Sequence, residues 1–125
     1  MAKIELTPTE LIVHITGMDK LWSLHSQLRI PLDHVRDVTL DTEIARAGPR
    51  PVRLLGTYIP GVVAAGTFGL PGKELVFWDV HDPDEAIVIY LEHERYAGLV
   101  VEVDDPQAAA SAIITATARQ PHRDR

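Results

Sequence analysis

The order of the predicted elements is the feature that most restricts this fold. Short β-rich runs follow one another along the chain, and a single long helical segment comes last. Parallel βαβ units would need helices alternating with the strands, so this order predicts a mainly β (α+β) domain of about seven antiparallel strands. The β-rich runs cover residues 4–6, 11–16, 27–31, 35–41, 52–55, 74–80, 86–91 and 98–103.

Two of the predicted strand pairs are hairpins. Residues 4–6 and 11–16 flank the turn sequence TPT, and Leu11, Val13 and Ile15 are expected to share one face. Residues 74–80 and 86–91 form the clearest hairpin, because the sequence HDPDE between them is rich in turn residues.

One long and one short helix are expected. Asp105 is a suitable N-cap and Pro106 suits the first helical position, so the terminal helix is predicted to run to Arg119. A shorter helix is predicted after Gly17, with Trp22 as its core anchor.

The chain has 125 residues, which fit a single domain, predicted here over residues 1–119 and followed by a disordered tail over 120–125. There is no cysteine, which excludes disulfides, thiolate metal sites and cysteine nucleophiles. The expected location is therefore the reducing cytoplasm. No apolar run approaches the ~20 residues of a membrane span.

The negative charge lies in the second half of the chain. Residues 1–53 carry seven basic and seven acidic side chains, so the whole formal charge of -6 belongs to residues 54–125. Residues 74–105 contain ten carboxylates and one basic residue, Arg95. Such a field repels phosphates and anionic headgroups, so we expect no nucleic-acid binding and no strong membrane or phosphoinositide binding.

No group of residues has the spacing of a catalytic or metal site. The acidic segment 79–85 lacks the glycine and the distant glutamate of a calcium loop. In the sequence EHER at 92–95, His93 lies between carboxylates, but neighbouring side chains on an extended segment point to opposite faces. Lys73 is followed by Glu74, where a phosphate loop needs Ser or Thr. We therefore expect no enzyme activity, no catalytic residue, no metal and no cofactor.

The glycine-rich segment 56–72 is the predicted interaction loop. Five glycines interrupt it, and a purely solvated loop would contain fewer apolar side chains. A competing interpretation is that these residues fold back as an irregular strand and belong to the core. The predicted anchors are Tyr58, Ile59, Val62, Val63, Phe68 and Leu70.

Arg46, Arg50 and Arg53 form the one basic cluster of the sequence. Guanidinium groups can hold a phosphate or the carboxylate of a partner, which makes this cluster a candidate anion-binding site. Alternatively, the three side chains only solvate a proline-rich connection.

Several motifs resemble the bacterial pleckstrin-homology-like (PH-like) domains of unknown function. They are GTYIPG at 56–61, AGTF at 65–68, LVFWDV at 75–80, AIVIYL at 86–91 and LVVEVDDP at 99–106. The resemblance implies a partly open antiparallel β-barrel of seven strands, plugged by the C-terminal helix. It also implies a binding or assembly module rather than a catalyst. Residues 6–10 lack the Lys and Arg of the lipid-binding members, so lipid binding is not implied.

Two functions follow as hypotheses. The first is a non-catalytic interaction or assembly module that binds a protein partner or itself. The alternative is a small-ligand-binding protein or small enzyme with a pocket at the open end of the barrel. Buried titratable groups converging in a deep pocket would favour the alternative.

Because no ligand set has metal spacing, we expect calcium, magnesium and zinc to leave the melting temperature unchanged. Differential scanning fluorimetry with each ion measures this directly. A rise of several degrees at micromolar metal would contradict the interpretation of residues 79–85 as a simple turn.

Overall fold

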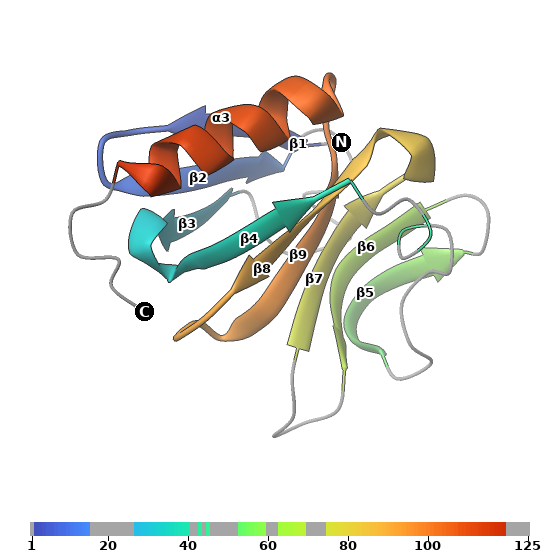
Figure 1. Ribbon diagram of the computed structural model, residues 1–125. Helices are drawn as coiled ribbons and strands as arrows, with labels where there is room; N and C mark the ends of the chain where they lie inside the picture. The colour runs from blue at the N-terminus through green and yellow to red at the C-terminus, as the bar shows by residue number, and fades with distance from the viewer. Residues whose placement is uncertain are drawn as a thin grey trace.

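The computed structural model describes residues 2–15, 27–40, 43, 45, 53–59, 63–69 and 75–119. Within 53–59 and 63–69, Thr67 is the one side chain described. This part of the chain contains nine strands, two short 3-10 helices and one long α-helix (Figure 1). They are β1 (Ala2–Leu6), β2 (Glu10–Ile15), β3 (Gln27–Pro31), η1 (Leu32–His34), β4 (Val35–Thr39), β5 (Arg53–Ile59), β6 (Val63–Gly69), β7 (Leu75–Val80), η2 (Pro83–Glu85), β8 (Ala86–Leu91), β9 (Tyr96–Glu102) and α3 (Pro106–Ala118).

The described strands form two sheets. The smaller has the order β1-β2-β3, and the larger has the order β4-β8-β9-β7-β6-β5. The mainly β (α+β) class is confirmed, although the nine strands exceed the predicted seven. The barrel is not confirmed, because no pairing among the described residues joins the two sheets. The pairing is not antiparallel throughout either, since β7 and β9 run parallel.

The first hairpin forms as the sequence predicts. The Thr7 hydroxyl accepts a hydrogen bond from the Glu10 N–H at 2.9 Å, and this bond closes the turn between β1 and β2. Leu11, Val13 and Ile15 alternate into the core from β2, as expected from strand periodicity.

The predicted hairpin of residues 74–80 with 86–91 is wrong in its pairing, although both strands exist. β7 and β8 lie on opposite sides of β9, which pairs with β7 in parallel and with β8 in the antiparallel sense. Residues 81–85 are therefore a connection that passes the end of β9 rather than a hairpin turn.

β9 takes the central position because it is apolar toward both faces of the larger sheet. Leu99 and Val101 belong to the core between the sheets, whereas Val100 belongs to a second cluster on the opposite face. A nearly continuous apolar run of this kind is typical of strands in the interior of a sheet. At Gly98, a Cβ atom would lie 3.3 Å from the carbonyl oxygen of Ile89, so glycine suits the close approach of β8.

Glu102 fixes the connection to the end of β9. Glu102 is only 7% exposed. Its Oε1 atom accepts hydrogen bonds from the N–H groups of His81 at 2.7 Å and Asp82 at 2.9 Å. The Val103 N–H donates to the Glu85 carbonyl at 3.0 Å. A buried carboxylate is costly unless hydrogen-bonded, and these two amides meet that need.

α3 begins at the predicted residues. The Asp105 side chain accepts a hydrogen bond from the Ala108 N–H at 3.1 Å, and Pro106 is the first helical residue. Ala110 and Ile113 enter the core that the two sheets share. Figure 1 shows the helix lying along the smaller sheet, and it also contacts β4 and β8 of the larger one. The helix thus joins the two sheets through one core.

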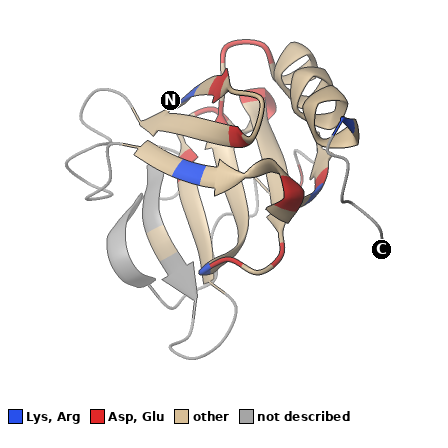
Figure 2. Ribbon diagram, turned by 90° about the vertical axis from the view of Figure 1, so that its left-hand side faces the viewer, with Lys and Arg blue, Asp and Glu red and all other residues tan. Residues whose placement is uncertain are grey.

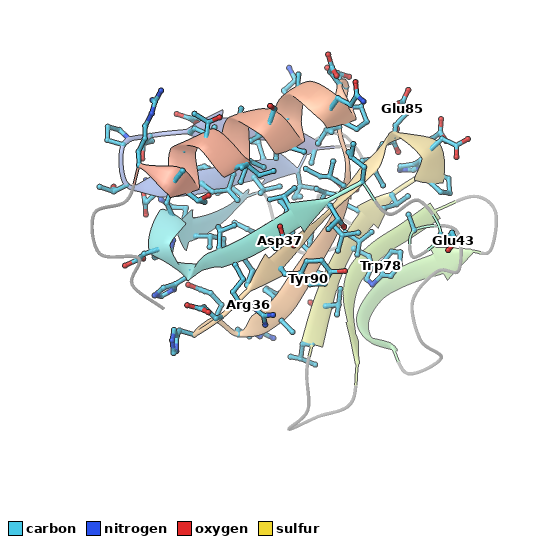
Figure 3. The ribbon with its side chains drawn as sticks, in the orientation of Figure 1. Arg36, Asp37, Glu43, Trp78, Glu85 and Tyr90 are labelled. Atoms are coloured by element: carbon cyan, nitrogen blue, oxygen red, sulfur yellow. The ribbon has the colours of Figure 1, made fainter. Side chains whose placement is uncertain are left out.

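A second apolar cluster lies on the other face of the larger sheet. It contains Trp78, Val88 and Val100, and Ala45 from the connection between β4 and β5 packs with them. Tyr90 is partly buried at its border, and Figure 3 shows Trp78 and Tyr90 on the same face of the sheet. The three central strands are therefore covered on both faces.

The loop expected over residues 56–72 is wrong for most of that segment, and the alternative, in which these residues fold back as a strand, is closer to the structure. β5 and β6 pair antiparallel, with Gly56 opposite Gly66 and Ile59 opposite Val63. β6 pairs in turn with β7, and this cross-strand support outweighs the weak strand preference of glycine. The predicted short helix after Gly17 and the tail 120–125 lie outside the described residues.

Replacing Glu102 should destabilise the fold more than replacing an exposed acid nearby. Glu102→Ala leaves two N–H groups without their acceptor, and we expect a loss of about 2–3 kcal/mol in the free energy of unfolding. Asp104→Ala, at an exposed position two residues away, should change it by less than about 0.5 kcal/mol. Urea denaturation compares the two variants, and equal losses would contradict the role assigned to Glu102.

Candidate functional site

The predicted interaction residues lie largely in the β5–β6 hairpin. Tyr58 and Ile59 end β5, and Val63 and Phe68 belong to β6. The other two, Val62 and Leu70, lie outside the described residues, as do the side chains of these four. The structure therefore places the backbone of four of the six candidate residues in two strands, and the interface itself stays a prediction.

The candidate anion-binding arginines are described only in part. Arg53 is the first residue of β5, with its backbone paired to Phe68. Arg46 and Arg50 lie outside the described residues. An anion site at this cluster stays a prediction.

Two histidines and two carboxylates from distant parts of the sequence lie together at one corner of the fold. We call Asp33, His34, His93 and Glu94 the histidine corner. His34 Nδ1 lies 2.5 Å from Glu94 Oε2, and the His34 and His93 rings meet edge to face with centroids 5.9 Å apart. Asp33 Oδ1 is 4.0 Å from His34 Nε2. The Glu92 N–H also donates to the His34 carbonyl at 2.9 Å.

The corner connects two chain reversals. η1 leads from β3 into β4, and residues 92–95 lead from β8 into β9 with His93 in the left-handed region at φ 61°. The pairing of β4 with β8 places Val35 opposite Leu91 and so brings the two reversals together. His34 and Glu94 are 60 residues apart, which is why no local motif indicates their contact. Because these side chains pair with one another across the two connections, we interpret the histidine corner as a structural clasp, meaning a contact that holds the two connections together.

Among the side chains that the structure describes, the buried polar ones belong to Thr67, Asp79 and Glu102. The Thr67 and Tyr96 hydroxyls are 3.1 Å apart and share a hydrogen bond between β6 and β9. Within the described ranges, no three His, Asp or Glu side chains are close enough to hold a metal ion. Over the same ranges, no helix combines the length and apolarity that a bilayer crossing requires.

A groove of about 850 Å³ lies between the β1–β2 turn, η1 and α3. We call it the helix groove. Its apolar lining comes from Leu6, Pro8, Leu32, Ala112 and Ala116, and its hydroxyl groups come from Thr7, Thr9, Ser111 and Thr115. The volume is in the range of small-molecule sites. Sequence analysis missed this groove, because it depends on how α3 packs against a turn about a hundred residues earlier.

Of the residues that the structure describes, Arg119 is the one charged residue that lines the helix groove. Figure 2 shows acidic residues at turns and strand ends, and α3 itself carries no charged residue between Pro106 and Ala118. The described part of the lining contains neither a carboxylate nor a histidine, so it offers no acid–base pair. Its chemistry suits binding, with hydroxyls and one guanidinium as the polar contacts.

Comparisons with protein families, with curated proteins and with solved structures find no match to this chain.

The histidine corner should contribute modestly to stability through the His34–Glu94 pair. Both side chains are less than one-third exposed, at 29% and 21%. We expect a coupling free energy of about 1 kcal/mol in a double-mutant cycle with His34→Gln and Glu94→Gln, measured by urea denaturation at pH 6. The matched pair His14 and Glu5, which is more exposed, should give a smaller coupling. A larger coupling for the exposed pair would contradict the clasp.

Proposed function

We propose that this chain is a non-catalytic interaction or assembly module that binds a protein partner or further copies of itself through the β5–β6 hairpin. The place of β5 at the end of the larger sheet carries this proposal. In the described part of the chain, β5 pairs with β6 alone. An end strand presents backbone N–H and C=O groups to which another strand can be added.

The composition of the hairpin supports the same role. The β5 sequence RLLGTYI contains no Lys and no Pro, the residues that commonly protect an edge from pairing. Tyr58 and Phe68 are aromatic, and aromatic side chains often anchor protein interfaces. An antiparallel pair of two β5 strands would have two-fold symmetry, the commonest symmetry of homo-oligomers.

The second candidate is a small-ligand-binding protein, and the helix groove favours it. The groove has the volume of a ligand site, and its lining combines apolar side chains with hydroxyl groups. The lining residues that the structure describes supply hydroxyls and a guanidinium but no general acid or base, so binding suits the groove better than catalysis.

The resemblance to bacterial PH-like domains agrees with a binding module and remains part of the proposal. So does a cytoplasmic location, which rests on the absence of cysteine. The charge of -6 supports a protein partner over nucleic acid or an anionic membrane.

Truncating Tyr58 and Phe68 should weaken association while leaving the free energy of unfolding nearly unchanged. Tyr58→Ala and Phe68→Ala should each weaken self-association or partner capture at least about tenfold if these side chains are interface anchors. The free energy of unfolding should fall by less than about 1 kcal/mol. Light scattering across a concentration series measures self-association, and pull-downs that compare each variant with the parent measure partner capture.

Ile114→Ala is the matched control, because Ile114 is a large apolar side chain that is 48% exposed on α3. It should leave association unchanged. Losses of about 3–5 kcal/mol in the hairpin variants, with association of the folded molecules intact, would identify Tyr58 and Phe68 as core residues and overturn the proposal.

A further inference from the structure

We propose that the helix groove binds a small aliphatic carboxylate, with its carboxylate at Arg119 and its hydrocarbon body along α3. This inference rests on the ligand-binding candidate function and names its ligand class. It does not depend on the β5–β6 hairpin, so the two proposals can fail separately.

The shape of the groove fits an elongated apolar body. Its wall on α3 extends from Ser111 to Arg119, about 12 Å along the helix axis at ~1.5 Å per residue. Ala112 and Ala116 lie between these ends, and Leu6 and Leu32 face them from the β1–β2 hairpin and η1. Hydrocarbon placed there would leave water for an apolar surface.

The charge of the groove selects an anion. The protein carries a charge of -6, yet among the described residues the groove lining has one charged group, and it is a guanidinium. The carboxylates of the adjoining hairpin are engaged elsewhere, since Glu10 pairs with Arg29 at 2.8 Å and Glu5 with His14 at 2.7 Å. Among the described residues, Arg119 forms no ion pair. Its planar donors match a carboxylate.

The position of Arg119 explains why the ligand needs a hydrocarbon body as well as a carboxylate. Arg119 caps the C-terminal end of α3, where the last carbonyls carry partial negative charge. That charge opposes an anion held by the guanidinium alone. A ligand that also buries hydrocarbon along α3 gains hydrophobic free energy in addition, so the groove should discriminate against small inorganic or short anions.

The polar groups on the wall are available for a ligand. Within the described part of the chain, the hydroxyls of Ser111 and Thr115 make no side-chain hydrogen bond. The Thr7 hydroxyl is different, because it already accepts hydrogen bonds from the N–H groups of Thr9 and Glu10. Contacts with a carboxylate should therefore come from the α3 side.

The test titrates octanoate into the full chain and monitors binding by two-dimensional amide NMR. We expect saturable shifts at Ser111, Thr115 and Arg119 with octanoate, and much weaker binding of acetate and of uncharged 1-octanol. Arg119→Gln should weaken octanoate binding about tenfold, the effect of losing one charge-assisted hydrogen bond. Ala112→Leu, which fills the groove from an exposed position, should weaken it as much.

Each variant has a matched control on the described surface. Arg36→Gln removes an exposed arginine of β4, and Ala108→Leu adds the same bulk at an exposed position of α3 outside the groove. Both should bind octanoate as the parent does.

Three results would overturn the inference. Equal binding of octanoate and 1-octanol would show that Arg119 does not recognise the carboxylate, although the groove would still bind a ligand. Tighter binding of a short peptide with an apolar C-terminal residue would reassign the groove to a protein terminus. Absence of saturable shifts with every probe would remove the ligand site itself, whatever the hairpin variants do in the association assay.

Discussion

The insertion of β9 between β7 and β8 is the constraint on which the rest of the fold depends. β9 is apolar toward both faces, so a hairpin of β7 with β8 would leave it at an edge with apolar surface exposed. Placing β9 in the centre buries both of its faces, but the connection from β7 to β8 must then cross the C-terminal end of β9. Glu102 accepts hydrogen bonds from the crossing segment at that point, so one buried carboxylate secures the order of the central strands.

The same strand order sets where the candidate surfaces lie. With β7, β8 and β9 in the middle of the larger sheet, β4 and β5 become its two ends. β4 continues through η1 into the smaller sheet, and its pairing with β8 assembles the histidine corner. In the described residues β5 has one neighbour, so the hairpin that contains Tyr58 and Phe68 occupies the other end.

Local features of this fold could be predicted from the sequence, and long-range ones could not. The Asp105 cap and the alternation of β2 depend on residues within a few positions, and both are confirmed. The pairing of residues 74–80 depends on a strand that comes later, so turn residues alone predicted the wrong partner. The nearly continuous apolar run of β9 was the available signal of a central strand. The His34–Glu94 contact and the helix groove had no such signal, because distant segments create them.

α3 shows why stability and binding can be separated in this chain. Ile113 is fully buried in the shared core, whereas its neighbour Ala112 is exposed and lines the helix groove. Adjacent helical residues differ by about 100° around the axis, so core packing and groove shape are set by different positions. Packing does not demand small residues at exposed positions such as Ser111, Ala112 and Thr115. Their small size keeps a groove open beside Arg119, and a ligand would make use of that space.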